Sequence, residues 1–165
     1  MPFKKNSFFN TSRITVLMAM GAVAISMVVL MGWLYQSPIL TSFSNEWVGM
    51  KVNTALGALS VIGSVLFFTS GRKGISAWLA LFTLLLGTVT TAEYAFRWNA
   101  GIDEFFFGDH ATVNYPGRMS QIIAISFILS GISLLFLQNK KYRILTDILS
   151  ILVLAAGFLS FTGYL

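Results

Sequence analysis

Five long apolar stretches predict that this chain of 165 residues folds within a lipid bilayer. They cover residues 14–35, 52–70, 75–95, 122–137 and 144–164. A helix needs about 20 apolar residues to cross a bilayer, and the stretches have about that length. Because hydrocarbon offers the backbone no hydrogen-bond partner, each stretch should be helical. We predict an all-α fold, a polytopic transmembrane helix bundle of about five spans, in which residues 1–165 form a single integral membrane domain.

The composition narrows the classes of site that the chain can carry. Charged residues make up only 10% of it, whereas water-soluble domains usually carry about 25%. It has no cysteine, which excludes disulfides, thiolate catalysis and cysteine-ligated metals. Its one histidine, His110, excludes a bis-histidine haem or a two-histidine zinc site within one chain. The net charge of +5 comes from basic residues that lie between the spans, so we expect a lipid bilayer as partner and no nucleic acid.

The basic residues also predict an orientation. Eight of them fall on one side of the bundle and three on the other. The eight are Lys4, Lys5, Arg13, Arg72, Lys73, Lys140, Lys141 and Arg143, and the three are Lys51, Arg97 and Arg118. Cytoplasmic loops are enriched in basic residues, so we expect a cytoplasmic N-terminus, with residues 96–121 on the outer side. We also expect either that the chain ends at the interface or that the natural sequence continues past Leu165.

The connection over residues 96–121 is the longest in the chain, and long connections are often functional. It contains three consecutive phenylalanines, Phe105, Phe106 and Phe107. Three placements are open for them: a plug packed on the mouth of the bundle, insertion into the membrane interface, or the lining of a ligand pocket.

Several polar residues in and beside this loop are candidates for a site. Pro116 and Gly117 indicate a turn. A cation is unfavourable at the start of the next helix, so Arg118 should pair with Asp103 or Asp109. Glu93 and Arg97 are four residues apart at the end of the third stretch and predict a structural ion pair.

His110 leaves three roles open: an external proton sensor, one axial ligand of a haem shared between chains, or a solvated side chain. No Ser/His/Asp arrangement, phosphate-binding loop or acidic metal cluster is visible, so we predict no catalytic residues, no metal site and no enzyme activity. The sequence does not identify a cofactor, and a haem, a quinone and a pigment all stay open.

An internal repeat links two of the spans. Met50 lies just before the second stretch and is followed five residues later by Ala55. Met119 lies just before the fourth stretch and is followed in the same way by Ala124, 69 residues after the first copy. One unit would be an outward span, an outer loop and a returning span, which predicts two duplicated helical hairpins and a fifth helix.

These residues also carry a family resemblance. The run Gly101-Ile102-Asp103-Glu104-Phe105-Phe106-Phe107, followed by Pro116-Gly117-Arg118-Met119-Ser120, resembles the MASE-like N-terminal membrane sensor regions of bacterial sensor histidine kinases and GGDEF diguanylate cyclases. The stretch from Met50 to Leu56 and the ending Gly163-Tyr164-Leu165 are similar to other parts of those regions. In that family a further helix leads to a signalling module, which this sequence lacks, and Gln121-Ile122-Ile123 departs from the family's pattern.

We therefore favour a non-catalytic membrane sensory or signal-input domain of a bacterial signalling system, which reads a ligand, lipid or redox carrier at its outer loop and bundle mouth. The residues expected to form a structured lid are Gly101, Ile102, Asp103, Pro116, Gly117, Arg118 and Met119. The alternative is a small structural or accessory subunit of a larger membrane protein complex, with other membrane chains or a second copy as partners. An electron-transfer subunit is a third hypothesis. A channel is least favoured because the spans lack charges at mid-membrane depth.

Overall fold

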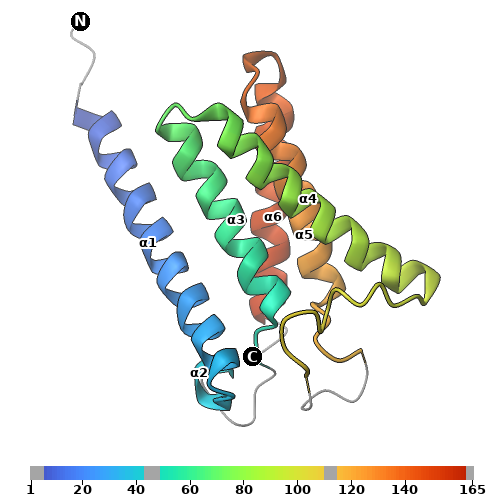
Figure 1. The fold of residues 1–165 in the computed structure, drawn as a ribbon. Coiled ribbons are helices and arrows are strands. Elements are labelled where there is room, and N and C mark those ends of the chain that lie inside the picture. Colours follow the sequence, from blue (N-terminus) through green and yellow to red (C-terminus); the bar gives the residue numbers. More distant parts are fainter. Residues whose placement is uncertain (1–5, 43–48, 110–114, 163–165) are drawn as a thin grey trace, which may run out of the picture.

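The computed structural model describes residues 6–42, 49–109 and 115–162, and these residues form helices and no strands (Figure 1). The elements are α1 (Asn6–Leu34), the short α2 (Pro38–Ser42), α3 (Val52–Thr69), α4 (Lys73–Phe96), α5 (Gln121–Leu137), the 3₁₀ turn η1 (Lys140–Tyr142) and α6 (Arg143–Thr162). The predicted all-α fold is confirmed. The predicted spans are helical except at Tyr35 and Ser70, which lie just past α1 and α3, and residues 163 and 164 of the fifth span are outside the described residues. The first helix begins earlier than expected, and α2 was not predicted.

The helices differ in how well their length suits a bilayer. Four described helices are long and apolar enough to cross a membrane: α1 over Ile14–Leu34, α3, α4, and α6 over Arg143–Ser160. The fifth, α5, is apolar but has 17 residues. At about 1.5 Å per residue it is roughly 26 Å long, which is shorter than the roughly 30 Å of a hydrocarbon core.

Successive long helices run in opposite directions (Figure 1). We call the end that holds residues 97–109 and 115–120 the loop end, and the opposite end, which holds Gly71, the turn end. The chain runs along α1 to the loop end, back along α3, out again along α4 and back along α5, before α6 returns to the loop end. This is the order of helices that the two-hairpin repeat predicts. Along the described chain α1 contacts α2 and α3, whereas α5 contacts α3, α4 and α6.

The packed face of α4 consists of five small residues and one glutamate. Its buried positions recur every three or four residues: Ser76, Ala80, Thr83, Gly87, Thr90 and Glu93. Large apolar side chains such as Trp78, Phe82 and Leu85 are exposed on the outside. This pattern is typical of membrane helices, which associate through small residues because lipid already solvates the large apolar ones.

Helices α4 and α5 approach each other through two reciprocal glycines. A Cβ atom at Gly87 would lie 2.5 Å from the carbonyl oxygen of Ala124 on α5, and a Cβ atom at Gly131 would lie 2.9 Å from that of Ala80 on α4. Neither position can take a larger residue without moving a backbone. This contact holds α5 beside α4 and so fixes where α5 begins at the loop end.

We expect Gly87→Ala to destabilise the bundle by about 1–3 kcal/mol, the usual cost of adding a methyl group to a packed site. The matched control is Gly157→Ala on α6, where a Cβ would meet nothing within 4 Å. That change should be neutral or slightly stabilising, since alanine favours the helix. The midpoint of reversible unfolding by sodium dodecyl sulfate in mixed micelles measures both. Equal midpoints for the two variants would show that the glycine contact is unimportant.

Candidate functional site

Asp103 lies in the loop and joins the start of α3 to the start of α5. Its Oδ2 accepts a hydrogen bond from Nε of Arg118 at 2.7 Å, and both side chains are almost fully buried. Its Oδ1 accepts from the Asn53 side-chain amide, in the first turn of α3, at 3.2 Å. The same amide also donates to the carbonyl oxygen of Ile102 at 3.1 Å. The predicted pairing of Arg118 with Asp103 therefore forms.

Asp109 also joins the start of α3 to the turn that precedes α5. Its Oδ2 accepts from Nζ of Lys51 at 2.6 Å and from the backbone N–H of Gly117 at 2.8 Å. Lys51 immediately precedes α3, and Gly117 lies in the turn before α5. The backbone N–H of Asp109 in turn donates to the Glu104 carboxylate at 3.0 Å. Each aspartate thus binds both helix starts, and we call these contacts together the loop-end network.

Arg118 has the largest number of partners in the loop-end network. Its Nη2 donates to the carbonyl oxygen of Trp98 at 3.3 Å and lies 3.5 Å from Oε1 of Glu93. Its guanidinium also lies over the rings of Tyr94 and Tyr115, 5.3 and 4.9 Å from their centroids, within cation–π range. Burial lowers the pKa of Arg118, but the hydrogen bond to Asp103 and the charge of Glu93 outweigh this, so the net pKa lies above its ordinary value. The side chain therefore stays charged.

Glu93 contacts Arg118, and the predicted ion pair between Glu93 and Arg97 is wrong. Arg97 lies four residues after Glu93 and ends α4 in the left-handed conformation, with φ of 50°. Because the helix ends there, the Arg97 side chain does not lie on the helix face that carries Glu93. The Arg97 side chain is exposed, whereas Glu93 is fully buried. Oε1 of Glu93 instead accepts the backbone N–H of Ala100 at 2.7 Å.

Three buried polar atoms on or next to α4 have no hydrogen-bond partner among the described residues. They are Oγ1 of Thr90, Oε2 of Glu93 and Nη1 of Arg118. Thr90 and Glu93 are three residues apart on one face of α4, and Glu93 pairs with Arg118. A buried polar atom without a partner costs about 1–3 kcal/mol. The loop-end network therefore holds unused hydrogen-bonding capacity on both a cation and a carboxylate.

The turn before α5 has a backbone that only certain residues adopt easily. Gly117 has φ of +70°, and a Cβ there would collide with the carbonyl oxygen of Asp103. Tyr115 is also left-handed, with φ of 54°, and Pro116 follows it. Gly101 has φ of +75° but lies in open space, so its role is conformational alone.

Met119 and Ser120 connect this turn to α5. The carbonyl oxygen of Met119 accepts from the hydroxyl of Tyr94 at 3.0 Å, and its side chain is buried against Ala124 and Phe127. The hydroxyl of Ser120 accepts from the N–H of Ile123 and caps the helix. The turn thus holds the start of α5 against α4.

The three phenylalanines separate into two groups. Phe105 and Phe106 are exposed and meet edge to face, with ring centroids 5.0 Å apart. Phe107 is partly buried, 6.5 Å from the ring of Trp33 at the end of α1. Trp33 itself donates from Nε1 to the carbonyl oxygen of Met50 at 2.8 Å. Phe107 therefore joins α1 to the loop, whereas its two neighbours do not pack into the bundle.

His110 lies outside the described residues, so its three alternatives stay predictions. Among the described side chains, no group of three histidines or acidic residues is placed to hold a metal ion.

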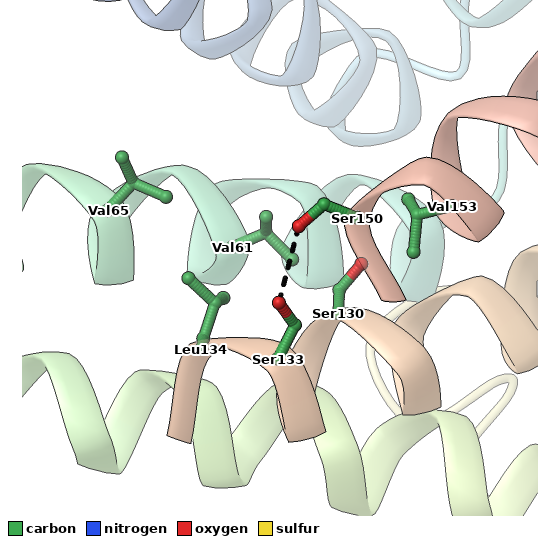
Figure 2. Close-up of a pocket in the computed structure, with 7 residues that line it drawn as sticks. All are labelled: Val61, Val65, Ser130, Ser133, Leu134, Ser150 and Val153. Atoms are coloured by element: carbon green, nitrogen blue, oxygen red, sulfur yellow. Dashed lines mark hydrogen bonds between the residues drawn. The ribbon is translucent and has the colours of Figure 1, made fainter. Parts of the chain in front are cut away.

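A mostly apolar cavity of about 180 Å³, with three serines in its lining, lies between α3, α5 and α6 (Figure 2). Its lining residues are Val61, Val65, Ser130, Ser133, Leu134, Ser150 and Val153. Ser133 and Ser150 lie 3.3 Å apart and both donate to the carbonyl oxygen of Thr146, which joins α5 to α6. The cavity lies where α3 and α6 make no contact, and it carries no charged side chain.

The sequence reasoning missed Lys51, Asn53 and Tyr94 as members of the loop-end network. A signal for Lys51 was present in the internal repeat. Lys51 follows Met50 and Arg118 precedes Met119, so each copy has a cation beside its methionine at a helix start, although not at the same position of the repeat. Ala55 and Ala124, which occupy the same place in the two copies, are both fully buried. The repeat therefore marks two equivalent helix starts that meet at one site.

No protein-family model, curated protein or solved structure matches this chain in the comparisons made with it.

We expect Arg118→Ala to destabilise the protein by about 3–5 kcal/mol, because it leaves two buried carboxylates without their cation. Arg118→Lys should recover part of this loss, since it keeps the charge but not the planar set of donors. The control is Arg97→Ala, an exposed arginine in the same segment, whose effect should stay within about 0.5 kcal/mol. Unfolding midpoints in detergent measure all three. A midpoint for Arg118→Ala near that of Arg97→Ala would contradict the assigned role.

The two carboxylates near Arg118 should differ in importance. Asp103→Asn removes a charged hydrogen bond of 2.7 Å and should cost about 1.5–3 kcal/mol. Glu93→Gln should cost less, because Glu93 lies 3.5 Å from Arg118 and an amide oxygen can still accept from Ala100. The same unfolding measurement ranks them. The opposite order would mean that Glu93 is the principal partner of Arg118.

Proposed function

We propose that this chain is a non-catalytic signal-input domain of a bacterial inner membrane, which reads a ligand, lipid or redox carrier at the loop end. In this proposal the N-terminus is cytoplasmic and residues 96–121 lie on the outer side, as the distribution of basic residues predicts. The residue patterns shared with membrane sensor regions of kinases and diguanylate cyclases also support it.

The observation that carries the proposal is the double connection made by Asp103 and Asp109. Each aspartate binds the starts of both α3 and α5, and Arg118 links them to Glu93 at the end of α4. A molecule that competes for Arg118 would change contacts at three helix ends at once. Buried charges have few stable arrangements, because each must keep a partner, so such competition favours a discrete shift of helices over a gradual one.

The unused atoms of the loop-end network support a binding role. Nη1 of Arg118 and Oε2 of Glu93 are buried and have no hydrogen-bond partner among the residues that the structure describes. A ligand that forms a hydrogen bond with either atom would remove the free-energy cost of leaving that atom unpaired. It would therefore bind more tightly to the helix arrangement in which the atom is accessible, and would shift the protein toward that arrangement.

The test measures whether helix positions at the turn end respond to events at the loop end. Because the chain has no cysteine, spin labels can be placed at Ser70→Cys, after α3, and Leu137→Cys, at the end of α5. The double-labelled protein in lipid nanodiscs is then given three probes in turn: a short-chain quinone, phosphatidylglycerol and succinate. We expect one of them to shift the distance between the labels by about 1–2 Å, the size of helix shifts in known switches.

Arg118→Lys should abolish that shift, and Arg97→Lys should leave it intact. A shift that persists in Arg118→Lys would show that the loop-end network is not the sensor. If no probe moves the labels, and pull-down from native membranes recovers the chain in a fixed complex, the alternative of a structural or accessory subunit would replace the proposal. The large exposed surfaces of α1 and α6 are compatible with such a complex.

A further inference from the structure

The loop end buries charged groups and exposes aromatic rings, which is the opposite of what a protein surface in water usually does. Three of its charged groups are buried: Asp103 and Asp109 are 6% and 4% exposed, and Arg118 is 6% exposed. Its phenylalanines point outward: Phe105 is 76% and Phe106 58% exposed. A loop in water would bury the aromatic rings and solvate the carboxylates, because burying apolar area is favourable and burying charge is costly.

Other aromatic side chains of the same segment share this exposure. Phe96, the last residue of α4, is 79% exposed, and Trp98 and Tyr115 are 57% and 51% exposed. Tryptophan and tyrosine are enriched where a membrane meets water, since their rings combine an apolar body with a polar group. The exposed side chains of this segment therefore resemble an interfacial belt more than an aqueous loop.

Helix lengths place this segment at the edge of the hydrocarbon. Helix α5 has 17 residues and α4 has 24, which correspond to roughly 26 and 36 Å. With a hydrocarbon core of about 30 Å, α4 reaches beyond it while α5 ends inside it. The loop that joins them must return from the long helix to the start of the short one (Figure 1). The described residues between Phe96 and Gln121, 97–109 and 115–120, consequently pass through the interface.

The aromatic surface also continues a surface that faces lipid. Phe82, Leu85 and Phe96 are exposed on α4, one of the helices suited to cross a membrane, and Trp98 follows directly. The exposed charged residues of the segment, Arg97 and Glu104, have long side chains that can extend to headgroups while their stems stay among apolar groups.

We infer that residues 96–107 form a membrane-inserted ledge, with Phe105 and Phe106 placed in the lipid at the boundary between headgroups and acyl chains. Lipid then covers the loop-end network on this side and keeps its ion pairs out of water. The partner of this surface is the bilayer itself, and the inference holds whether or not the protein is a sensor.

The absence of cysteine allows a direct test. Single spin labels are introduced through Phe105→Cys and Phe106→Cys in the full chain, reconstituted in nanodiscs of phosphatidylcholine and phosphatidylglycerol. Collision rates with oxygen, which concentrates in lipid, and with a water-soluble nickel chelate report the surroundings of each label. Leu85→Cys, on the outer face of α4, is the hydrocarbon reference, and Ser70→Cys, at the exposed turn, is the water reference.

We expect the ratio of oxygen to nickel collisions at both phenylalanine positions to exceed that at Ser70 several-fold and to approach that at Leu85. A ratio at either position equal to that at Ser70 would place the ledge in water and overturn the inference. Labels shielded from both reagents would also overturn it, because they would show that another protein surface covers the phenylalanines. Unchanged unfolding midpoints of the labelled chains confirm that the fold is intact.

Discussion

The contact between Arg118 and Asp103 decides how the loop end is built. Neither charge can stay in a buried site without the other, and together they bring a loop residue and a helix start within 2.7 Å. The position of Asp103 then places Asn53, and the Arg118 guanidinium places Glu93, Trp98 and the two tyrosine rings. Helices that associate through small residues leave considerable freedom in how they tilt, so this fixed ionic contact supplies the specificity that the apolar faces lack.

The medium explains why much of the fold could be predicted from the sequence. Hydrocarbon requires long apolar helical runs, so the spans were visible without any knowledge of packing: the predicted fourth span begins at Ile122, and α5 begins at Gln121. The pairing of Arg118 with Asp103 was also within reach, because a cation at a helix start needs a local acid.

The rest of the site depended on backbone turns that the sequence does not mark. Arg97 takes the left-handed conformation that usually belongs to glycine or asparagine, and this turns the chain so that Glu93 faces Arg118 instead of Arg97. The acid nearest to Lys51 in the sequence is Glu46, whereas its partner Asp109 lies 58 residues away along the chain. Such contacts follow from how the helices converge, which apolar periodicity alone does not specify.

Helix α5 also connects the loop-end network mechanically to α6. At one end its first residues follow Arg118 and Met119, and near the other end Ser133 bonds to the Thr146 carbonyl of α6. Among the described elements α6 contacts only α5 and the short turn that joins them. Helix α5 is thus a rod held against α4 at two points, Gly87 against Ala124 and Gly131 against Ala80, and it bonds to α6 just past the second. A small displacement of the Arg118 guanidinium would be transmitted to α6 through α5, because α5 is the only long helix among the described elements that α6 contacts.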